Sequence, residues 1–271
     1  MSPRRRVSGE DIIEMSGVET LHPGGLDISR RIGEVVHLDP SLHVLDVSSG
    51  KGVFACLYAR EFGCRVTGLD LNEAFTEEAR RRAAMEGLNG KVEFRVGDSR
   101  ALPFADGQFD VVVNECAVGL TAIGDSRGVL HEMARVTKPG GTVVIHESTW
   151  LRELSVLERE DAAERLGTTP FTVEEWKAML AEAGCPAVLV EDWSGIENAR
   201  KVRPGHHWKR NDSLAFFTGP EMAVLLVRVV ARFGLRSLLD LYRSRAILTG
   251  YVKQGVLGYA LVVAKKGEPA A

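Results

Sequence analysis

The sequence predicts an α/β protein built on an open, mostly parallel sheet with helices on both faces. Between residues 26 and 146, short apolar segments alternate with helical segments every ~20–30 residues, the rhythm of parallel strands joined by helical crossovers. The chain is 45% apolar and 26% charged, values typical of a globular enzyme. Its 271 residues leave room for one domain with an insertion.

The regular part of the chain follows a polar, turn-rich arm with a short helix expected at 10–15. A helix is predicted from 27 to 36, because Ile28, Ile32 and Val35 fall on one face. The predicted strands are 43–47, 65–69, 92–96, 109–114 and 142–146. The predicted helices between them are 53–63, 73–86 and 129–136, with a loop at 101–108 and a turn at 138–141.

The rhythm changes after residue 150. A helix is predicted at 151–166, and Thr172 is predicted to cap a helix at 173–183, because Glu175 completes a capping box. The remaining predicted elements are a strand at 187–192, an irregular polar segment at 193–217 that contains His206-His207-Trp208, apolar helices at 221–233 and 235–248, and a last strand at 258–265.

The stretch from residue 44 to 52 reads VLDVSSGKG, an apolar strand that contains Asp46 and runs into a turn of small residues. Such a turn lets the backbone come close to a ligand, because small residues leave room and tolerate unusual dihedrals. Asp70 and Asp98 stand at the ends of the next two strands. Since strand ends of a parallel sheet line the ligand crevice, the spacing predicts one site for a nucleotide-like cofactor.

A dinucleotide site is the alternative, because residues 50–55 read GKGVFA and match the G-x-G-x-x-A fingerprint. Asp46 and Asp98 separate the two interpretations, since a dinucleotide site requires neither. A positively charged amino-acid group on the ligand would explain Asp46, because a carboxylate favours a nearby ammonium. An NAD(P)-dependent oxidoreductase would also need a hydride-transfer site, and the sequence has no Tyr-x-x-x-Lys pair to supply one.

Taken together, six motifs resemble the S-adenosylmethionine-dependent methyltransferases with the Rossmann-like fold, small-molecule type. They are VLDVSSGKG (44–52), GLD (68–70), GDS (97–99), LPF (102–104), FDVV (109–112) and KPGG (138–141). The resemblance implies a doubly wound sheet of order 3-2-1-4-5-7-6 with an antiparallel last strand. We expect an N-terminal arm (1–25), a methyltransferase domain (26–192 plus 256–267) and a helical, cap-like insertion (193–255) between strands six and seven.

The resemblance also implies which residues hold S-adenosylmethionine and its product, S-adenosylhomocysteine. Gly50 and Gly52 would approach the methionine part, Asp46 the ammonium, Asp70 the ribose and Asp98 the adenine amino group. Ser48 departs from the family pattern, which has glycine there, and its hydroxyl would add a contact. The remaining expected cofactor residues are Leu71, Ser99 and Asn114.

The acceptor is expected to be a small molecule with an O, N or C nucleophile. Glu115 and Cys116 follow strand four, and His146 and Glu147 follow strand five, so both pairs point toward the acceptor side. We assign His146, Glu115 and Cys116 as candidate catalytic residues, His146 as general base. A histidine hydrogen-bonded beneath the cleft and a small buried cysteine are the structural alternatives. A functional alternative is an S- or arsenic-methyltransferase that uses Cys116. A second functional alternative is a non-catalytic cofactor-binding protein.

Net charge, cysteine content and the segment 220–248 indicate which partners and which cellular location to expect. A formal net charge of −3 gives no reason to expect nucleic acid. Four cysteines without CxxC pairing predict neither disulfides nor a metal site, and no signal peptide or transmembrane segment is found, so we expect a cytoplasmic protein. The arginine-bearing apolar segment 220–248 offers a homodimer contact, a membrane-surface contact, a substrate cover or a solvated helix face.

Overall fold

A computed structural model describes residues 7, 9–16, 23–120, 124–195 and 219–268. The predicted segment His206-His207-Trp208 lies outside these ranges. Within the described residues, no helix is long and apolar enough to cross a membrane.

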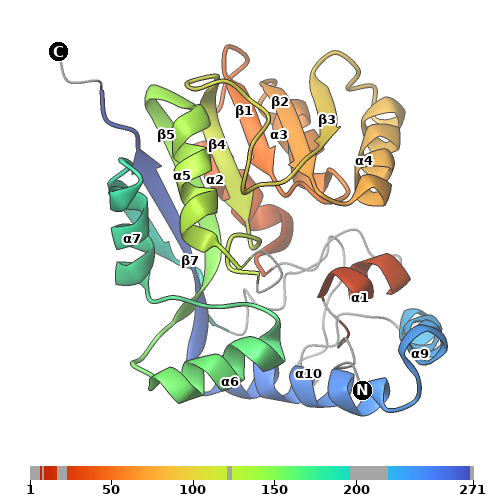
Figure 1. Cartoon of the computed structure of the whole chain (residues 1–271). Coiled ribbons are helices and arrows are strands. Elements are labelled where there is room, and N and C mark those ends of the chain that lie inside the picture. The colour runs from red at the N-terminus through yellow and green to blue at the C-terminus, as the bar shows by residue number, and fades with distance from the viewer. Residues whose placement is uncertain (1–6, 8, 17–22, 121–123, 196–218, 269–271) are drawn as a thin grey trace.

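The described residues form a seven-stranded sheet of order β3-β2-β1-β4-β5-β7-β6, which confirms the predicted fold class (Figure 1). Strands β1 to β5 pair in parallel, and β7 runs antiparallel to both β5 and β6. The strands are β1 (His43–Val47), β2 (Arg65–Asp70), β3 (Val92–Val96), β4 (Phe109–Glu115), β5 (Thr137–Trp150), β6 (Ala187–Asp192) and β7 (Leu257–Lys265).

Helices cover both faces of the sheet. One apolar core lies under α2 (Gly25–Val35), α3 (Val53–Glu61) and α4 (Glu73–Met85), and the other lies under α5 (Ser126–Val136) and α7 (Val173–Glu182). Burial of both cores, from the aliphatic side chains of the central strands, supplies the main driving force for this arrangement. The carboxyl ends of the parallel strands all meet at one edge, the lower edge in Figure 1.

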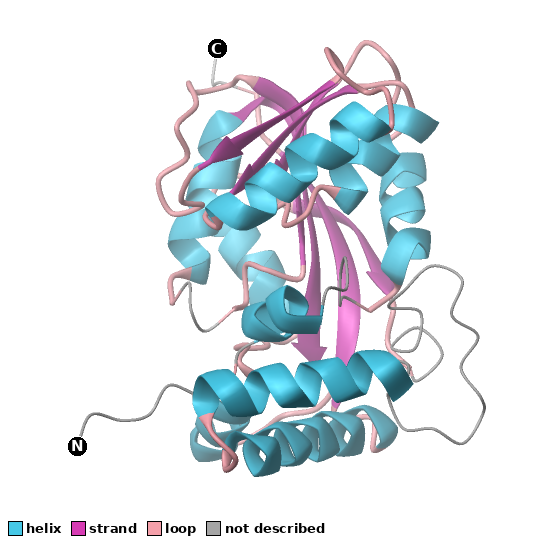
Figure 2. Cartoon of the chain, turned by 90° about the vertical axis from the view of Figure 1, so that its right-hand side faces the viewer, coloured by secondary structure: helices cyan, strands magenta, loops and turns pink. Residues whose placement is uncertain are grey.

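A helical lobe lies beyond that edge (Figures 1 and 2). It contains α1 (Gly9–Ser16), α6 (Val156–Leu166), α9 (Gly219–Phe233) and α10 (Ser237–Lys253). Trp150 and Leu257, which end β5 and begin β7, pack with residues of α6 and α10 in a third apolar cluster. Met15 of α1 packs on Leu225 and Val229 of α9. The lobe therefore draws on α1 and α6 as well as on the predicted insertion.

Three local predictions are corrected by long-range pairing or by caps. β5 continues past residue 146 to Trp150, because β7 pairs with it along its whole outer half. The predicted turn at 138–141 is instead an irregularity in the pairing between β4 and β5. The helix predicted at 151 begins at Val156, after a capping box that Ser155 forms with Glu158. The capping box of Thr172 and Glu175 is confirmed.

Candidate functional site

The turn that follows β1 has an unusual backbone. Ser48, Gly50 and Gly52 all have positive φ, at 60°, 53° and 72°. This left-handed conformation suits glycine and costs other residues roughly 1–2 kcal/mol. The glycine expected by family resemblance at position 48 therefore has a conformational reason, and Ser48 keeps that conformation in spite of its side chain. Backbone strain of this kind concentrates at functional sites.

The two glycines of the turn have different surroundings. A Cβ built on Gly50 meets no atom within 4 Å, so the backbone there faces open space. A Cβ on Gly52 would lie 2.5 Å from the Phe94 ring and 2.8 Å from the Ala79 Cβ. Gly50 is therefore the glycine whose backbone a ligand can approach, whereas Gly52 is required by packing beneath the turn.

Asp70 ties this turn to β2. The Gly50 amide donates a hydrogen bond to Asp70 Oδ2 (2.7 Å), and the Asn72 amide donates to Asp70 Oδ1 (2.9 Å). Asn72 in turn caps α4 by accepting from the amides of Ala74 and Phe75. Leu71, between them, is exposed, as a side chain that packs on a planar ligand would be. The structure therefore brings Asp70 and Leu71 next to the turn after β1, and their contacts with a cofactor stay predictions.

Asp46 lies beneath the same turn and is almost fully buried. Its carboxyl group accepts a hydrogen bond from the Ala55 amide, but Oδ2 has no hydrogen-bond partner among the described residues. Burial raises the pKa of Asp46 well above its usual range, and the charges of Glu115 and Asp70 raise it further. A buried carboxyl oxygen without a partner is costly, so this atom is suited to receive a donor from a ligand.

Glu115 points to the same face of the sheet as Asp46. Its Oε2 accepts a hydrogen bond from the Ser29 hydroxyl (2.8 Å), and its Oε1 accepts one from the Tyr58 hydroxyl (2.7 Å). Ser29 of α2 and Tyr58 of α3 are both fully buried. Sequence reasoning missed these two residues, because only the packing of α2 and α3 against β4 brings them to Glu115. The polar position of Ser29 on the apolar face of its helix was the available signal.

Asp98 and Ser99 follow β3, one strand farther out. Both oxygens of Asp98 accept hydrogen bonds from the Arg100 guanidinium (2.6 to 3.1 Å), which lowers the pKa of the carboxyl group. Ser99 is buried beside it. The carboxylate is thus turned to Arg100 in this structure, and its contact with an adenine amino group stays a prediction.

Asn114 has a clear structural role at the end of β4. Its amide nitrogen donates to the Val47 carbonyl (2.9 Å), and its carbonyl oxygen accepts from the amides of Ala117 and Val118 (3.1 Å each). The side chain is fully buried. It therefore joins β1 to the loop after β4, and its predicted contact with a cofactor stays a prediction.

Cys116, directly after β4, lies beside His146, which is within β5. Cys116 Sγ lies 3.5 Å from His146 Nδ1, and the Cys116 amide donates to the His146 carbonyl (2.7 Å). Cys116 has a φ of 57°, the left-handed conformation again. Burial raises the pKa of the Cys116 thiol, and the charges of Glu147 and Glu115 raise it further. The thiol is therefore held in its protonated form and is a weak nucleophile.

Glu147 is a titratable group that the sequence analysis noted but did not assign. It is almost fully buried, and burial raises the pKa of its carboxyl group to about 7, although nearby backbone amides oppose the shift. The Gly119 amide donates to Glu147 Oε1 (3.3 Å). Burial is the main cause that raises the pKa of Tyr259 on β7, and the neighbouring Glu147 adds to it. A carboxyl group with a pKa near 7 can accept a proton and release it again at neutral pH.

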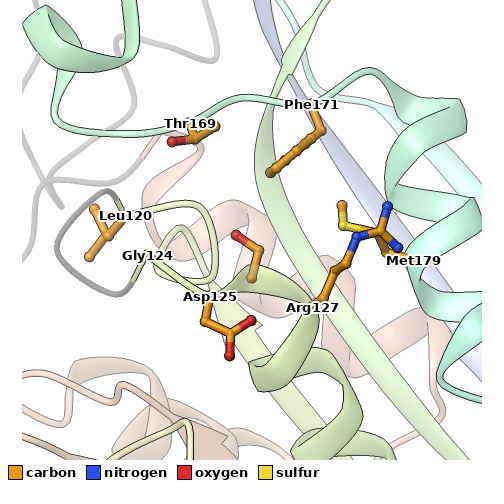
Figure 3. A pocket seen from close by; sticks show the side chains of 8 residues that line it. Leu120, Gly124, Asp125, Arg127, Thr169, Phe171 and Met179 are labelled. Carbon is orange, nitrogen blue, oxygen red and sulfur yellow. The ribbon is translucent and has the colours of Figure 1, made fainter. Parts of the chain in front are cut away.

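A pocket of about 250 Å³ lies on the other face of the sheet, between α5 and α7 (Figure 3). Phe171 and Thr169 line one side of it, and Asp125 and Arg127 at the start of α5 line the other. Asp46 and Glu115 instead face α2 and α3. The pocket is therefore separate from the cluster of predicted site residues. Within the described residues, no group of three His, Cys, Asp or Glu side chains could hold a metal ion.

The residues at the carboxyl edge fit the predicted cofactor. An ammonium group fits the unpartnered Oδ2 of Asp46, and the open side of Gly50 leaves room for a ligand along the turn. Asp70 and the exposed Leu71 follow on the neighbouring strand, where a ribose and a planar base would lie. A dinucleotide would leave the buried Asp46 oxygen without a donor.

Known proteins show the same fold and related sequences. Residues 44–141 match the family model described as a methyltransferase domain. The glycine/sarcosine/dimethylglycine N-methyltransferase of Actinopolyspora halophila is 29% identical over 204 residues, 71% of this chain and 34% of that protein. Methyltransferase GfsG of Streptomyces halstedii is 33% identical over 130 residues, 48% of this chain and 46% of that protein. This chain therefore spans less than half the length of these two relatives.

The crystal structure of the [4+2]-cyclase SpnF superimposes with a TM-score of 0.72 at 20% identity, covering 98% of this chain and 100% of that one. A likeness at this identity shows the fold alone, and one fold can carry different reactions. The reaction must therefore be argued from the site.

Proposed function

We propose that this chain, whose residues 44–141 match the methyltransferase-domain model, is an S-adenosylmethionine-dependent methyltransferase that transfers a methyl group to a small-molecule amine. The observation that carries the cofactor assignment is the buried, unpartnered Oδ2 of Asp46 beside the open turn at Gly50. When bound, the cofactor supplies an electrophilic methyl group on a sulfonium.

The negative charges near Cys116 indicate the class of the acceptor. The charges that act on Cys116 there come from the carboxyl groups of Glu147 and Glu115. Two buried carboxyl groups in this part of the fold favour a cationic ligand, and an amine is the methyl acceptor that carries positive charge in water. The N-methyltransferase of Actinopolyspora halophila, whose name states three amine substrates, supports this choice.

Glu147 supplies the proton chemistry that an amine needs. An ammonium must lose a proton before its nitrogen can attack, and a carboxylate with a pKa of about 7 accepts it without a large energetic penalty. His146, predicted as the base, is fully buried with Nδ1 directed at the Cys116 thiol. We keep His146 as an alternative base and propose Glu147 as the first candidate.

The direct test uses methyl-labelled cofactor with amines, phenols, carboxylates, thiols and arsenite. We expect label to pass to an amine. Transfer to a phenol or a carboxylate alone would overturn the acceptor class and leave the methyltransferase assignment intact. Calorimetry that shows binding of NAD but not of S-adenosylmethionine or S-adenosylhomocysteine would overturn the proposed function as a whole.

The S- or arsenic-methyltransferase alternative depends on a reactive Cys116. Its thiol pKa is raised, and Cys56, Cys64 and Cys185 are buried elsewhere in the fold. Cys116→Ser should therefore retain turnover with the amine acceptor, and complete loss of activity would favour the sulfur or arsenic alternative. A cytoplasmic location and a homodimer through residues 220–248 stay predictions, which fractionation and light scattering would test.

A further inference from the structure

Three carboxyl groups surround one position on the sheet. Asp46 pairs in register with Gly68 on β2 and with Val113 on β4. Asp70 and Glu115 each lie two residues farther along those strands, and alternate residues of a strand share a face. Asp46 therefore sits between Asp70 on one side and Glu115 on the other, all on the face covered by α2 and α3.

The two flanking carboxyl groups accept strong donors. Asp70 accepts from the amides of Gly50 and Asn72, and Glu115 accepts from the hydroxyls of Ser29 and Tyr58.

Asp46, in contrast, has one backbone donor and one oxygen without a partner among the described residues. Two negative neighbours and burial make its own charge unfavourable.

Among the residues that the structure describes, the other groups that face this cluster do not supply a positive charge. From α3 they are the Tyr58 hydroxyl and the Cys56 thiol, both with raised pKa values, and from α2 the group is the Ser29 hydroxyl. Lys51, in the turn itself, forms an ion pair with Glu78 of α4 at 3.1 Å. None of these described groups balances a charged Asp46, whereas the ammonium group of the ligand would.

We propose that the cofactor's ammonium group, on binding, displaces a proton from the Asp46 carboxyl group to solvent. The proposal rests on the proposed function and goes beyond it, because it concerns how binding is coupled to pH. The balance is simple: the neutral carboxyl and the ammonium become a carboxylate–ammonium pair, and one proton is released. Glu115 acts as a positioning residue, since its charge keeps the proton on Asp46 until the ammonium arrives.

The coupling has a defined sign. Where the empty site holds the proton and the occupied site does not, the dissociation constant falls about tenfold for each unit of rising pH. Above the pKa of Asp46 in the empty protein, affinity no longer changes from this cause. A ligand without an ammonium group does not displace the proton, so its affinity does not follow this trend.

The test is calorimetry of the full chain with S-adenosylhomocysteine, at about pH 6.5, in two buffers with different ionisation enthalpies. At this pH the amino group of the ligand is charged, so protons released come from the protein. We expect protons to be released on binding, at most one per ligand, and fewer as pH rises through the pKa of Asp46 in the empty protein. 5′-Methylthioadenosine, which keeps the nucleoside and lacks the amino-acid end, is the matched control and should release none.

Variants separate the contributions of the two acids. Asp46→Asn should abolish proton release, and Glu115→Gln should shift the pH at which affinity levels off to a lower value. Glu93→Gln, the same chemical change at an exposed position on β3, should leave both unchanged. The pH series with the unaltered protein needs no variant, so a misfolded Asp46→Asn protein would not remove the test.

Two failures are distinguishable. If S-adenosylhomocysteine binds with the same enthalpy in both buffers, proton displacement is wrong while the methyltransferase assignment stands. If it does not bind at any pH, the proposed function itself fails. Equal proton release with 5′-methylthioadenosine would also overturn the proposal, because the ammonium would not be its cause.

Discussion

Gly50 and Gly52 share a left-handed backbone two residues apart, yet Gly50 faces open space and Gly52 faces the Phe94 ring. The turn that follows β1 therefore uses one glycine for access and the other for packing.

Substitution of these two glycines should separate binding from stability. Gly52→Ala should lower the free energy of unfolding by roughly 2–4 kcal/mol, from the left-handed strain and the overlap with Phe94 and Ala79. Gly50→Ala should cost only about 1–2 kcal/mol, from the strain alone. It should instead weaken S-adenosylhomocysteine binding by partly closing the open side. Urea unfolding and calorimetry on both variants check this, and an equal loss of stability would contradict it.

Ser48 offers a stabilising substitution. Ser48→Gly should raise the free energy of unfolding by about 1 kcal/mol, because it removes the left-handed strain, part of which is offset by the greater freedom of glycine in the unfolded chain. The dissociation constant of S-adenosylhomocysteine measured on the same variant tests the predicted hydroxyl contact. Unchanged affinity would show that Ser48 makes no such contact.

Asp46 should make the ligand-free protein less stable as pH rises. Its pKa is raised in the folded state, so above the unfolded value of about 3.9 the folded protein holds a proton that the unfolded chain has released. The free energy of unfolding should therefore fall by at most about 1.4 kcal/mol per pH unit from this group, until pH passes the folded pKa. In the Asp46→Asn variant, the free energy of unfolding, measured by urea unfolding at several pH values, should depend less steeply on pH. An unchanged slope would mean that Asp46 is ionised in the empty protein.

Glu147 should set the pH profile of turnover. If it accepts the proton of an amine, kcat should rise with pH up to about 7 and then level off. Glu147→Gln should lower kcat by roughly 10²- to 10⁴-fold and remove that limb of the profile. Glu174→Gln, at an exposed position on α7, is the control. If the limb persists in Glu147→Gln and disappears in His146→Gln, the base is His146.

Local sequence signals predicted those parts of the fold that depend on local chemistry. The strand predicted at 187–192 is present with those bounds, and the capping box of Thr172 and Glu175 placed the start of α7 correctly. The start of α6 carries the same kind of signal in Ser155 and Glu158, which places it at Val156 rather than at Leu151. β5 exceeded its predicted length, since its outer half is held by β7, far away in the sequence.

Some residues of the candidate site could be predicted from the sequence, and others depend on packing. The turn at 48–52 and the acids at the strand ends follow from motif and topology, so sequence alone placed Asp46 and Asp70 together. The partners of Glu115 could not be predicted, because Ser29 and Tyr58 reach it only through helix packing. The role of Glu147 also depends on burial, which the residue type does not reveal.

The ladder between β5 and β7 places His146 opposite Leu261 and Glu147 opposite Ala260. Neighbouring residues of a strand point to opposite faces, so a one-residue slip of β5 would exchange the imidazole and the carboxyl group. The register of β5 in the sheet therefore decides which of the two side chains points to each face. A single-residue deletion in β5 before His146 would alter the proton chemistry of the protein without changing either side chain.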